Sequence, residues 1–164
     1  SLAGAVVGYF TNLFPNDPAQ VHRHGAQAAD CLYRGAWPAT APPHRGRRPP
    51  DHHAGLACGE PNTISWDILR NHATAFVSCP DWVSARGMRM LGVPVKGDPV
   101  VISGESGAVG MGLIAAIMET DEYKELREAI GLDRFSQVLM FSTEGNTDPM
   151  KFRKVLWDGE YPTV

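Results

Sequence analysis

One stretch decides the fold prediction: Phe141-Ser142-Thr143-Glu144-Gly145-Asn146-Thr147-Asp148. It follows a short apolar run and continues into small hydroxyl side chains and a glycine turn. This pattern is typical of the carboxyl end of a buried strand in an α/β enzyme, where ligands usually bind. From the residues alone, two interpretations of Ser142 and Thr143 stay open. They cap a turn, or they hydrogen-bond a heterocyclic nitrogen.

A second stretch has the same organisation: Ile102-Ser103-Gly104-Glu105-Ser106-Gly107-Ala108-Val109-Gly110. An apolar strand candidate leads into a turn with hydroxyls and a carboxylate, and then into a helix. Glu105 and Ser106 either cap that helix, whose start favours negative charge, or face a ligand. Gly104 and Gly107 permit a ligand to approach the backbone closely, although they also suit any tight turn. Together the two stretches predict one cofactor pocket built from two strand ends.

Composition limits the class of protein. With 164 residues, 43% of them hydrophobic, the chain is long enough to bury the core of one domain. A net charge of −3 gives no general attraction to nucleic acid, and no window approaches the roughly 20 apolar residues of a membrane span. We therefore predict neither nucleic acid nor membrane as a partner. We also predict no metal site, because His52 and His53 have no carboxylate or cysteine at a recognisable ligand spacing.

Helical and strand-like segments alternate along the chain. Helices are expected at 1–14, 26–33, 63–71, 82–91, 106–119 and 122–130, with Asn62 or Thr63 as the N-cap of the third and Gly131 ending the last. Short apolar strands are expected at 75–77, 100–102 and 137–141. The alternation predicts an α/β fold with a helix-covered, mainly parallel sheet.

Residues 37–53 have a different character. They contain five prolines, three arginines and three histidines without hydrophobic periodicity, so we expect a disordered surface excursion. Codon degeneracy allows a displaced reading frame to encode a more ordinary segment over 43–53, and likewise at 22–25. We hypothesise compensating frameshifts, which the encoding DNA read in three frames would test.

Six longer motifs occur in order and carry a resemblance: AGLACGEPNTISW (54–66), VSCPDW (77–82), G-D-P (97–99), ISGESGAVG (102–110), FSTEG (141–145) and WDG (157–159). Over nearly the whole chain, apart from 37–53 and the segment near 21–25, this set resembles the carboxyl-terminal portion of the diaminopropionate ammonia-lyase family. That family lies within the tryptophan-synthase β-like superfamily of pyridoxal-phosphate enzymes, which has fold type II. The resemblance implies a partial fold type II domain, incomplete at its amino end.

The resemblance also implies an activity. Enzymes of this family convert 2,3-diaminopropionate, a small amino-acid substrate, into pyruvate and ammonia with pyridoxal 5'-phosphate as cofactor. Ser142 matches the hydroxyl that contacts the pyridine nitrogen in this superfamily, and Thr143 is the next candidate. Gly104, Glu105 and Ser106 match the turn beside the same ring. A full-length relative of this kind is expected to be a cytoplasmic homodimer.

Two further sites are implied by the resemblance. Ser1 and Leu2 match the end of the glycine-rich loop whose amides bind the cofactor phosphate at a helix start. Cys31 and Cys58 lie where related lyases have a cysteine pair, which implies a disulfide or a gated thiol pair. Without the resemblance, the three cysteines, of which Cys79 is the third, are interpreted as buried reduced thiols of a cytosolic protein.

The sequence also departs from the family pattern. The family's Schiff-base lysine and acid/base carboxylate match no residue here, so we expect no catalytic residue within 1–164 and only half of the cofactor site. Position 146 is Asn where the family usually has Asp. We expect the carboxyl-terminal portion of one lyase domain, inactive alone. The alternatives are another fold type II dehydratase or ammonia-lyase, a truncated remnant that acts only as an interaction partner, and a generic phosphate-binding module.

Overall fold

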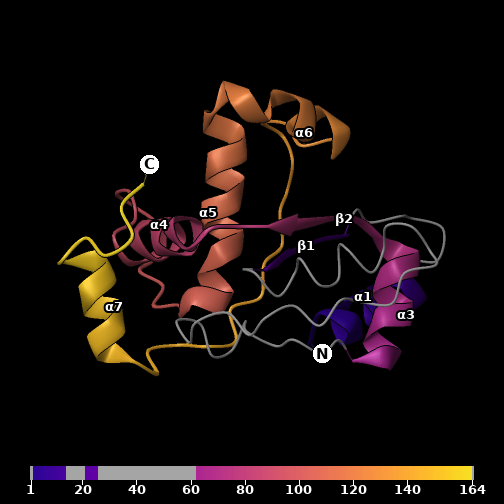
Figure 1. The fold of residues 1–164 in the computed structure, drawn as a ribbon, viewed down its shortest axis with the longest axis horizontal. Coiled ribbons are helices and arrows are strands. Elements are labelled where there is room, and N and C mark those ends of the chain that lie inside the picture. The colour runs from indigo at the N-terminus through magenta and orange to yellow at the C-terminus, as the bar shows by residue number, and fades with distance from the viewer. Residues whose placement is uncertain (1, 14–20, 26–61, 164) are drawn as a thin grey trace. The chain divides into compact units, whose positions relative to one another are not determined.

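The computed structural model describes residues 2–13, 21–25 and 62–163. The chain divides into two compact units, Ser1–Ser78 and Cys79–Val164, and each is described by itself (Figure 1). The predicted helix at 26–33 and the anomalous segment 37–53 lie outside the described residues. Within those residues, no helix combines the length and the apolar character needed to cross a membrane.

The first unit contains two helices and a pair of strands. Helix α1 (Leu2–Leu13) and helix α3 (Thr63–His72) confirm two predicted helices. Asn62 is the N-cap of α3, and its side chain accepts a hydrogen bond from the Ser65 amide at 2.9 Å. Such a cap satisfies an amide that has no partner within the helix. Gly8 of α1 faces Ile68 of α3, since a Cβ atom at Gly8 would lie 3.3 Å from Ile68 Cδ1.

The strands β1 (Val21–Gly25) and β2 (Ala73–Ser78) pair in parallel, with Val21 opposite Ala73 and Gly25 opposite Ser78. Figure 1 shows the two strands side by side. Strand β2 contains the predicted strand at 75–77. This two-stranded pair is parallel, but the larger helix-covered sheet predicted from the sequence stays a prediction.

The second unit is centred on two helices that meet through glycine. Helix α4 (Asp81–Gly92) packs across helix α5 (Glu105–Glu119) (Figure 1). A Cβ atom at Gly87 would overlap the Ala108 carbonyl oxygen, and one at Gly112 would overlap the Val83 carbonyl oxygen. The two backbones are therefore in direct contact, which a side chain at either glycine would prevent. We call this contact, formed by Val83, Gly87, Ala108 and Gly112, the glycine crossing.

The predicted helix at 122–130 is divided in the structure. A 3-10 turn, η1 (Asp121–Tyr123), comes first and is followed by helix α6 (Lys124–Ala129). Gly131 ends the helix as predicted, with a φ of +67°. The Leu132 amide donates to the Arg127 carbonyl at 2.9 Å and the Gly131 amide to the Glu128 carbonyl at 3.1 Å. This pair of bonds is a Schellman motif, which requires a left-handed residue that glycine adopts without strain.

The predicted strands at 100–102 and 137–141 are wrong for the described residues, which form no strand there. Several of their apolar side chains are exposed, including Val100, Val138 and Leu139. A strand is defined by a ladder of hydrogen bonds to a neighbour, and apolar character alone does not provide one. The Val101 amide instead donates to the Leu91 carbonyl at 2.9 Å, at the end of α4.

Helix α7 (Pro149–Leu156) was not predicted. Asp148, predicted to be a turn residue, is its N-cap and accepts from the Lys151 amide at 3.0 Å, with Pro149 in the first turn. Val155 of α7 is fully buried in a cluster with Ala85 and Met88 of α4 and Ala108 of α5. Proline and the short length hide this helix from a periodicity search.

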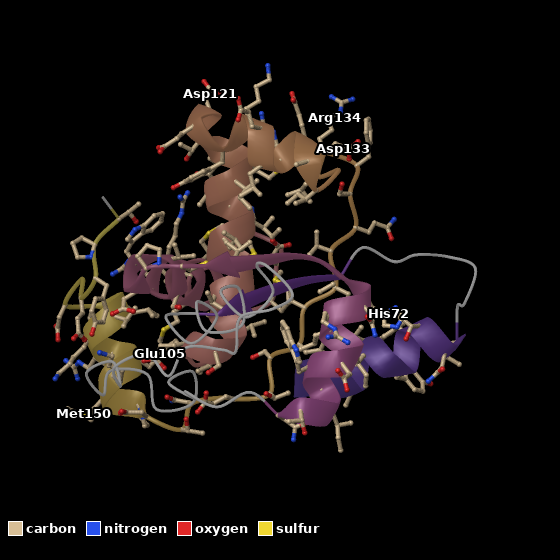
Figure 2. All side chains as sticks on the ribbon, turned by 45° about the vertical axis from the view of Figure 1, so that its right-hand side comes forward. His72, Glu105, Asp121, Asp133, Arg134 and Met150 are labelled. Atoms are coloured by element: carbon tan, nitrogen blue, oxygen red, sulfur yellow. The ribbon has the colours of Figure 1, made fainter. Side chains whose placement is uncertain are left out.

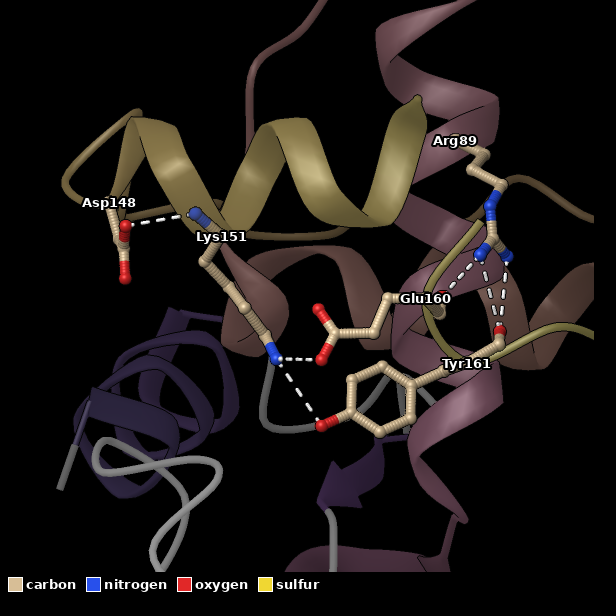
Figure 3. A network of polar contacts seen from close by, with 5 residues as sticks. All are labelled: Arg89, Asp148, Lys151, Glu160 and Tyr161. Carbon is tan, nitrogen blue, oxygen red and sulfur yellow. Dashed lines mark hydrogen bonds and ion pairs between the residues drawn. The ribbon is translucent and has the colours of Figure 1, made fainter. Parts of the chain in front are cut away.

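A polar network fastens the segment after α7 (Figure 3). The Arg89 guanidinium donates to the carbonyls of Val155, Glu160 and Tyr161. Lys151 Nζ donates to Glu160 Oε1 at 3.1 Å and to the Tyr161 hydroxyl at 3.3 Å. Partial burial lowers the pKa of Lys151, but these hydrogen bonds and the charges of Tyr161 and Glu160 outweigh it, so the pKa lies above its usual value. The network keeps Lys151 protonated at neutral pH.

Candidate functional site

The two stretches that the sequence singles out meet in the second unit. The Gly104 amide donates to the Glu144 carbonyl at 2.9 Å, so the segment before α5 lies beside the segment that contains Ser142. The hydroxyl oxygens of Ser103 and Ser142 are 2.7 Å apart, which is a normal distance for an O–H···O bond. We call this region, formed by Ser103, Gly104, Gly107, Ser142 and Glu144, the serine junction.

The two hydroxyls of the serine junction differ in exposure. Ser103 is completely buried, with 0% of its surface accessible, whereas Ser142 is exposed. A buried hydroxyl is costly unless it is hydrogen-bonded, and Ser103 lies 2.7 Å from Ser142 Oγ and 3.1 Å from the Gly104 carbonyl oxygen. The exposed hydroxyl is therefore fixed from behind by a buried one.

Gly107 lies beneath this pair of hydroxyls. A Cβ atom at position 107 would be 2.6 Å from Ser142 Oγ and 3.1 Å from Ser142 Cα, and it would overlap Ser103 Oγ. Any side chain at position 107 would displace both serines. Gly107 is therefore required for the geometry of the junction, beyond the general tolerance of glycine in a turn.

Glu144 covers the start of α5. A Cβ atom at Gly104, the N-cap residue of α5, would lie 3.2 Å from Glu144 Oε2. The Thr147 hydroxyl donates to Glu144 Oε1 at 3.3 Å. A carboxylate near a helix start is stabilised by the unpaired amides and the helix dipole. Glu144 therefore places negative charge at the edge of the site, next to the hydroxyl of Ser142.

The other candidates of this region take their predicted places along the backbone. Thr143 is exposed and follows Ser142, while Glu105 and Ser106 are half-buried in the first turn of α5. Figure 2 labels Glu105 at that turn. Since these residues surround the serine junction in the chain, the structure brings the two predicted stretches together. Sequence reasoning missed the pairing of Ser103 with Ser142 and the place of Glu144, although both residues lie within the quoted stretches.

The remaining candidates are not tested here. Ser1, Cys31 and Cys58 lie outside the described residues, and of Leu2 only its backbone, the first residue of α1, is described. Cys79 is a buried free thiol, and burial raises its pKa from 9.0 to about 11. Within the ranges that the structure describes, no group of three His, Cys, Asp or Glu side chains is arranged to hold a metal ion.

Comparison with known proteins first gives the structural class. The second unit and the first together match part of a pyridoxal-phosphate enzyme of fold type II. The matching enzyme is diaminopropionate ammonia-lyase. The crystal structure of the Escherichia coli enzyme in complex with D-serine is similar at a TM-score of 0.87 and 41% identity, covering 99% of this chain and 40% of that chain. The structure of the same enzyme with an aminoacrylate-PLP azomethine reaction intermediate matches at a TM-score of 0.85 and 41% identity, with the same coverage.

Comparison of sequences gives the same result. Diaminopropionate ammonia-lyase of Escherichia coli strain K12 is 43% identical over 163 residues, which cover 98% of this chain and 40% of the relative. The enzyme of Salmonella typhimurium is 40% identical over 162 residues, covering 97% of this chain and 40% of the relative. No protein-family model matches the chain. The resemblance to diaminopropionate ammonia-lyase is confirmed, and the chain spans about two fifths of the length of these relatives.

Proposed function

We propose that this chain is part of a pyridoxal-phosphate-dependent ammonia-lyase that converts 2,3-diaminopropionate into pyruvate and ammonia. Its contribution is the side of the pocket that contacts the cofactor ring. The observation that carries the proposal is an exposed Ser142 hydroxyl held by a buried Ser103 hydroxyl, in a chain that resembles this lyase over 98% of its length.

The residues of the serine junction fit the ring of this cofactor. Ser142 presents a neutral hydroxyl, which hydrogen-bonds a pyridine nitrogen without the charge that would keep that nitrogen protonated. Gly104 and Gly107 leave the surrounding backbone without side chains. Thr143, Glu105 and Ser106 complete the proposed ring contacts. When bound, pyridoxal phosphate withdraws electrons from the substrate Cα, and the protein orients the ring and adjusts its electronics.

The remaining parts of the notional enzyme are proposals of the same kind. Ser1 and Leu2 contribute to the phosphate end of the site, and Cys31 and Cys58 form a cysteine pair. The sheet is mainly parallel and covered by helices, with β1 and β2 as two of its strands. The complete enzyme is a cytoplasmic homodimer with a small amino acid as substrate. Because no lysine here falls in a matching motif, the chain alone has no catalytic residue and holds only half of the cofactor site.

A chimera tests the proposal. The matching portion of the Escherichia coli enzyme is replaced by this chain, and pyruvate release from 2,3-diaminopropionate is measured with pyridoxal phosphate present. We expect turnover by the chimera and none by the isolated chain. Ser142→Ala in the chimera should lower turnover at least about tenfold, whereas Ser136→Ala, in an exposed turn where its hydroxyl bonds Asp133, should not. A folded chimera that binds cofactor but releases no pyruvate would contradict the proposed reaction.

A second reaction is favoured by one observation. A structural relative of the chain is a complex of the Escherichia coli enzyme with D-serine, an amino acid with a β-hydroxyl in place of a β-amino group. The alternative is therefore a fold type II dehydratase. The same chimera assayed with 2,3-diaminopropionate and with D-serine decides between them, because a dehydratase would prefer the hydroxyl substrate. A chimera inactive with both substrates would favour the remaining alternative, a remnant that acts only as an interaction partner.

A further inference from the structure

The buried hydroxyl of Ser103 has only two oxygen acceptors within hydrogen-bond distance among the described residues. These are Ser142 Oγ at 2.7 Å and the Gly104 carbonyl oxygen at 3.1 Å. A serine hydroxyl carries a single proton, so Ser103 donates to only one of them at a time. The choice decides what Ser142 offers to a ligand.

Two arrangements of the protons are compatible with these distances. In the first, Ser103 donates to Gly104 and Ser142 donates to Ser103, so Ser142 presents only lone pairs outward. In the second, Ser103 donates to Ser142, and the proton of Ser142 is free to point outward. Without a ligand, the first arrangement satisfies both protons within the protein. A ligand that brings an acceptor nitrogen to Ser142 favours the second, because both protons are then satisfied and the chain of hydrogen bonds is cooperative.

The geometry points to Ser103 as a positioning residue that directs the proton of Ser142 toward the ligand's ring nitrogen. This inference rests on the proposed function, since it takes the ligand to be a pyridine ring with an unprotonated nitrogen. Ser103 does not touch the ring itself. It holds Ser142 Oγ in place, and by donating to that oxygen it makes Ser142 a hydrogen-bond donor.

The packing around Ser103 is consistent with this role and suggests the necessary control. Its hydroxyl is fully buried and lies over Gly107, so removal of the oxygen also leaves a small void. Ser103→Ala removes both the proton donor and the volume. Ser103→Cys keeps a similar volume but replaces the hydroxyl by a weak donor. Comparison of the two variants separates hydrogen bonding from packing.

The test uses the full chain and pyridoxine 5'-phosphate, which has the pyridine ring and phosphate but no aldehyde to react with surface lysines. Binding is followed by protein NMR and by the ¹⁵N chemical shift of the labelled ring nitrogen. Ser142→Ala and Ser103→Ala should each weaken binding about fivefold, the loss of one hydrogen bond. In Ser103→Ala and Ser103→Cys the ring ¹⁵N shift should return toward its free value. The double variant should bind no more weakly than Ser142→Ala, since Ser103 acts through Ser142.

Different results overturn different claims. If the unaltered chain does not bind pyridoxine phosphate, the proposed ring site is wrong and this inference falls with it. If the chain binds and only Ser142→Ala weakens binding, the role of Ser103 alone is wrong. Full binding and an unchanged ring shift in Ser103→Cys, beside weakened binding in Ser103→Ala, would assign Ser103 to packing and also overturn the inference.

Discussion

The glycine crossing and the serine junction lie in the same unit but depend on different contacts. At the crossing, backbone touches backbone, and the surrounding side chains Val83, Met88 and Ala108 are buried. At the junction, side-chain hydroxyls bond each other, and one of them, Ser142, is exposed. Helix α5 belongs to both, because Ala108 contacts α4 while the neighbouring Gly107 lies under the serines. The crossing thus provides a rigid support on which the junction places a reactive group.

The largest effect should come from a side chain at the glycine crossing. Gly112→Ala places a Cβ atom onto the Val83 carbonyl oxygen, and backbone cannot move away as the end of a flexible side chain can. We expect the free energy of unfolding to fall by about 3 kcal/mol or more in urea denaturation. The matched control is Gly145→Ala, where nothing lies within 4 Å of the added atom. Equal stability of the two variants would contradict the close helix contact.

A smaller loss is expected where a side chain, rather than the backbone, supports α4. Arg89→Met removes the guanidinium that donates to the carbonyls of Val155, Glu160 and Tyr161 but keeps the apolar stem. Loss of these charged hydrogen bonds should cost about 2 kcal/mol. Faster proteolytic cleavage after α7 should accompany it. Arg70→Met, which removes an exposed ion pair with Asp67, should cost no more than about 1 kcal/mol.

Gly107→Ala tests whether the junction is separable from the crossing. The added methyl group displaces Ser103 and Ser142, whose atoms have room to move toward solvent, so unfolding free energy should fall by only about 1.5 kcal/mol. Binding of pyridoxine phosphate should nevertheless be lost, because Ser142 no longer has its place. The comparison would be wrong if this variant unfolded as readily as Gly112→Ala or still bound the probe as the unaltered chain does.

A pH-dependent effect follows from the Cys79 thiol before α4. Burial raises its pKa to about 11, so the folded chain retains a proton that the unfolded chain releases from pH 9 upward. The stabilisation is complete below pH 9 and is lost as pH rises through about 11. Between pH 9 and pH 10 the loss should be about 1 kcal/mol. Cys79→Ala lacks the titrating group, so the difference between its unfolding curve and that of the unaltered chain isolates this contribution.

The smallest effect is expected at the exposed apolar residues that lead to the junction. Leu139 is 67% exposed, so Leu139→Ser should change the free energy of unfolding by less than about 0.5 kcal/mol. Thermal and urea denaturation measure it directly. A loss above about 2 kcal/mol would mean that Leu139 is buried in solution, and the contrast between a buried crossing and an exposed junction would then be wrong.

Local rules were sufficient to predict most helices of the described chain. Polar capping by Asn62, the apolar periodicity of α4 and α5, and the stop at Gly131 are properties of short segments, so sequence alone predicts them. Helix α7 was missed because it is short and begins with proline. The strands predicted at 100–102 and 137–141 were wrong because an apolar run indicates a tendency to be buried, whereas a strand needs a neighbour to bond.

The candidate site divides in the same way. The chemistry of the individual residues, a hydroxyl at Ser142 and small residues at Gly104 and Gly107, is a property of the sequence and led to the predicted pocket. Only the tertiary structure decided that Ser103 and Ser142, 39 residues apart, share a hydrogen bond. It alone also decided that Gly112 touches the backbone of α4. Such contacts depend on how distant segments pack against each other, and no local period or motif records that packing.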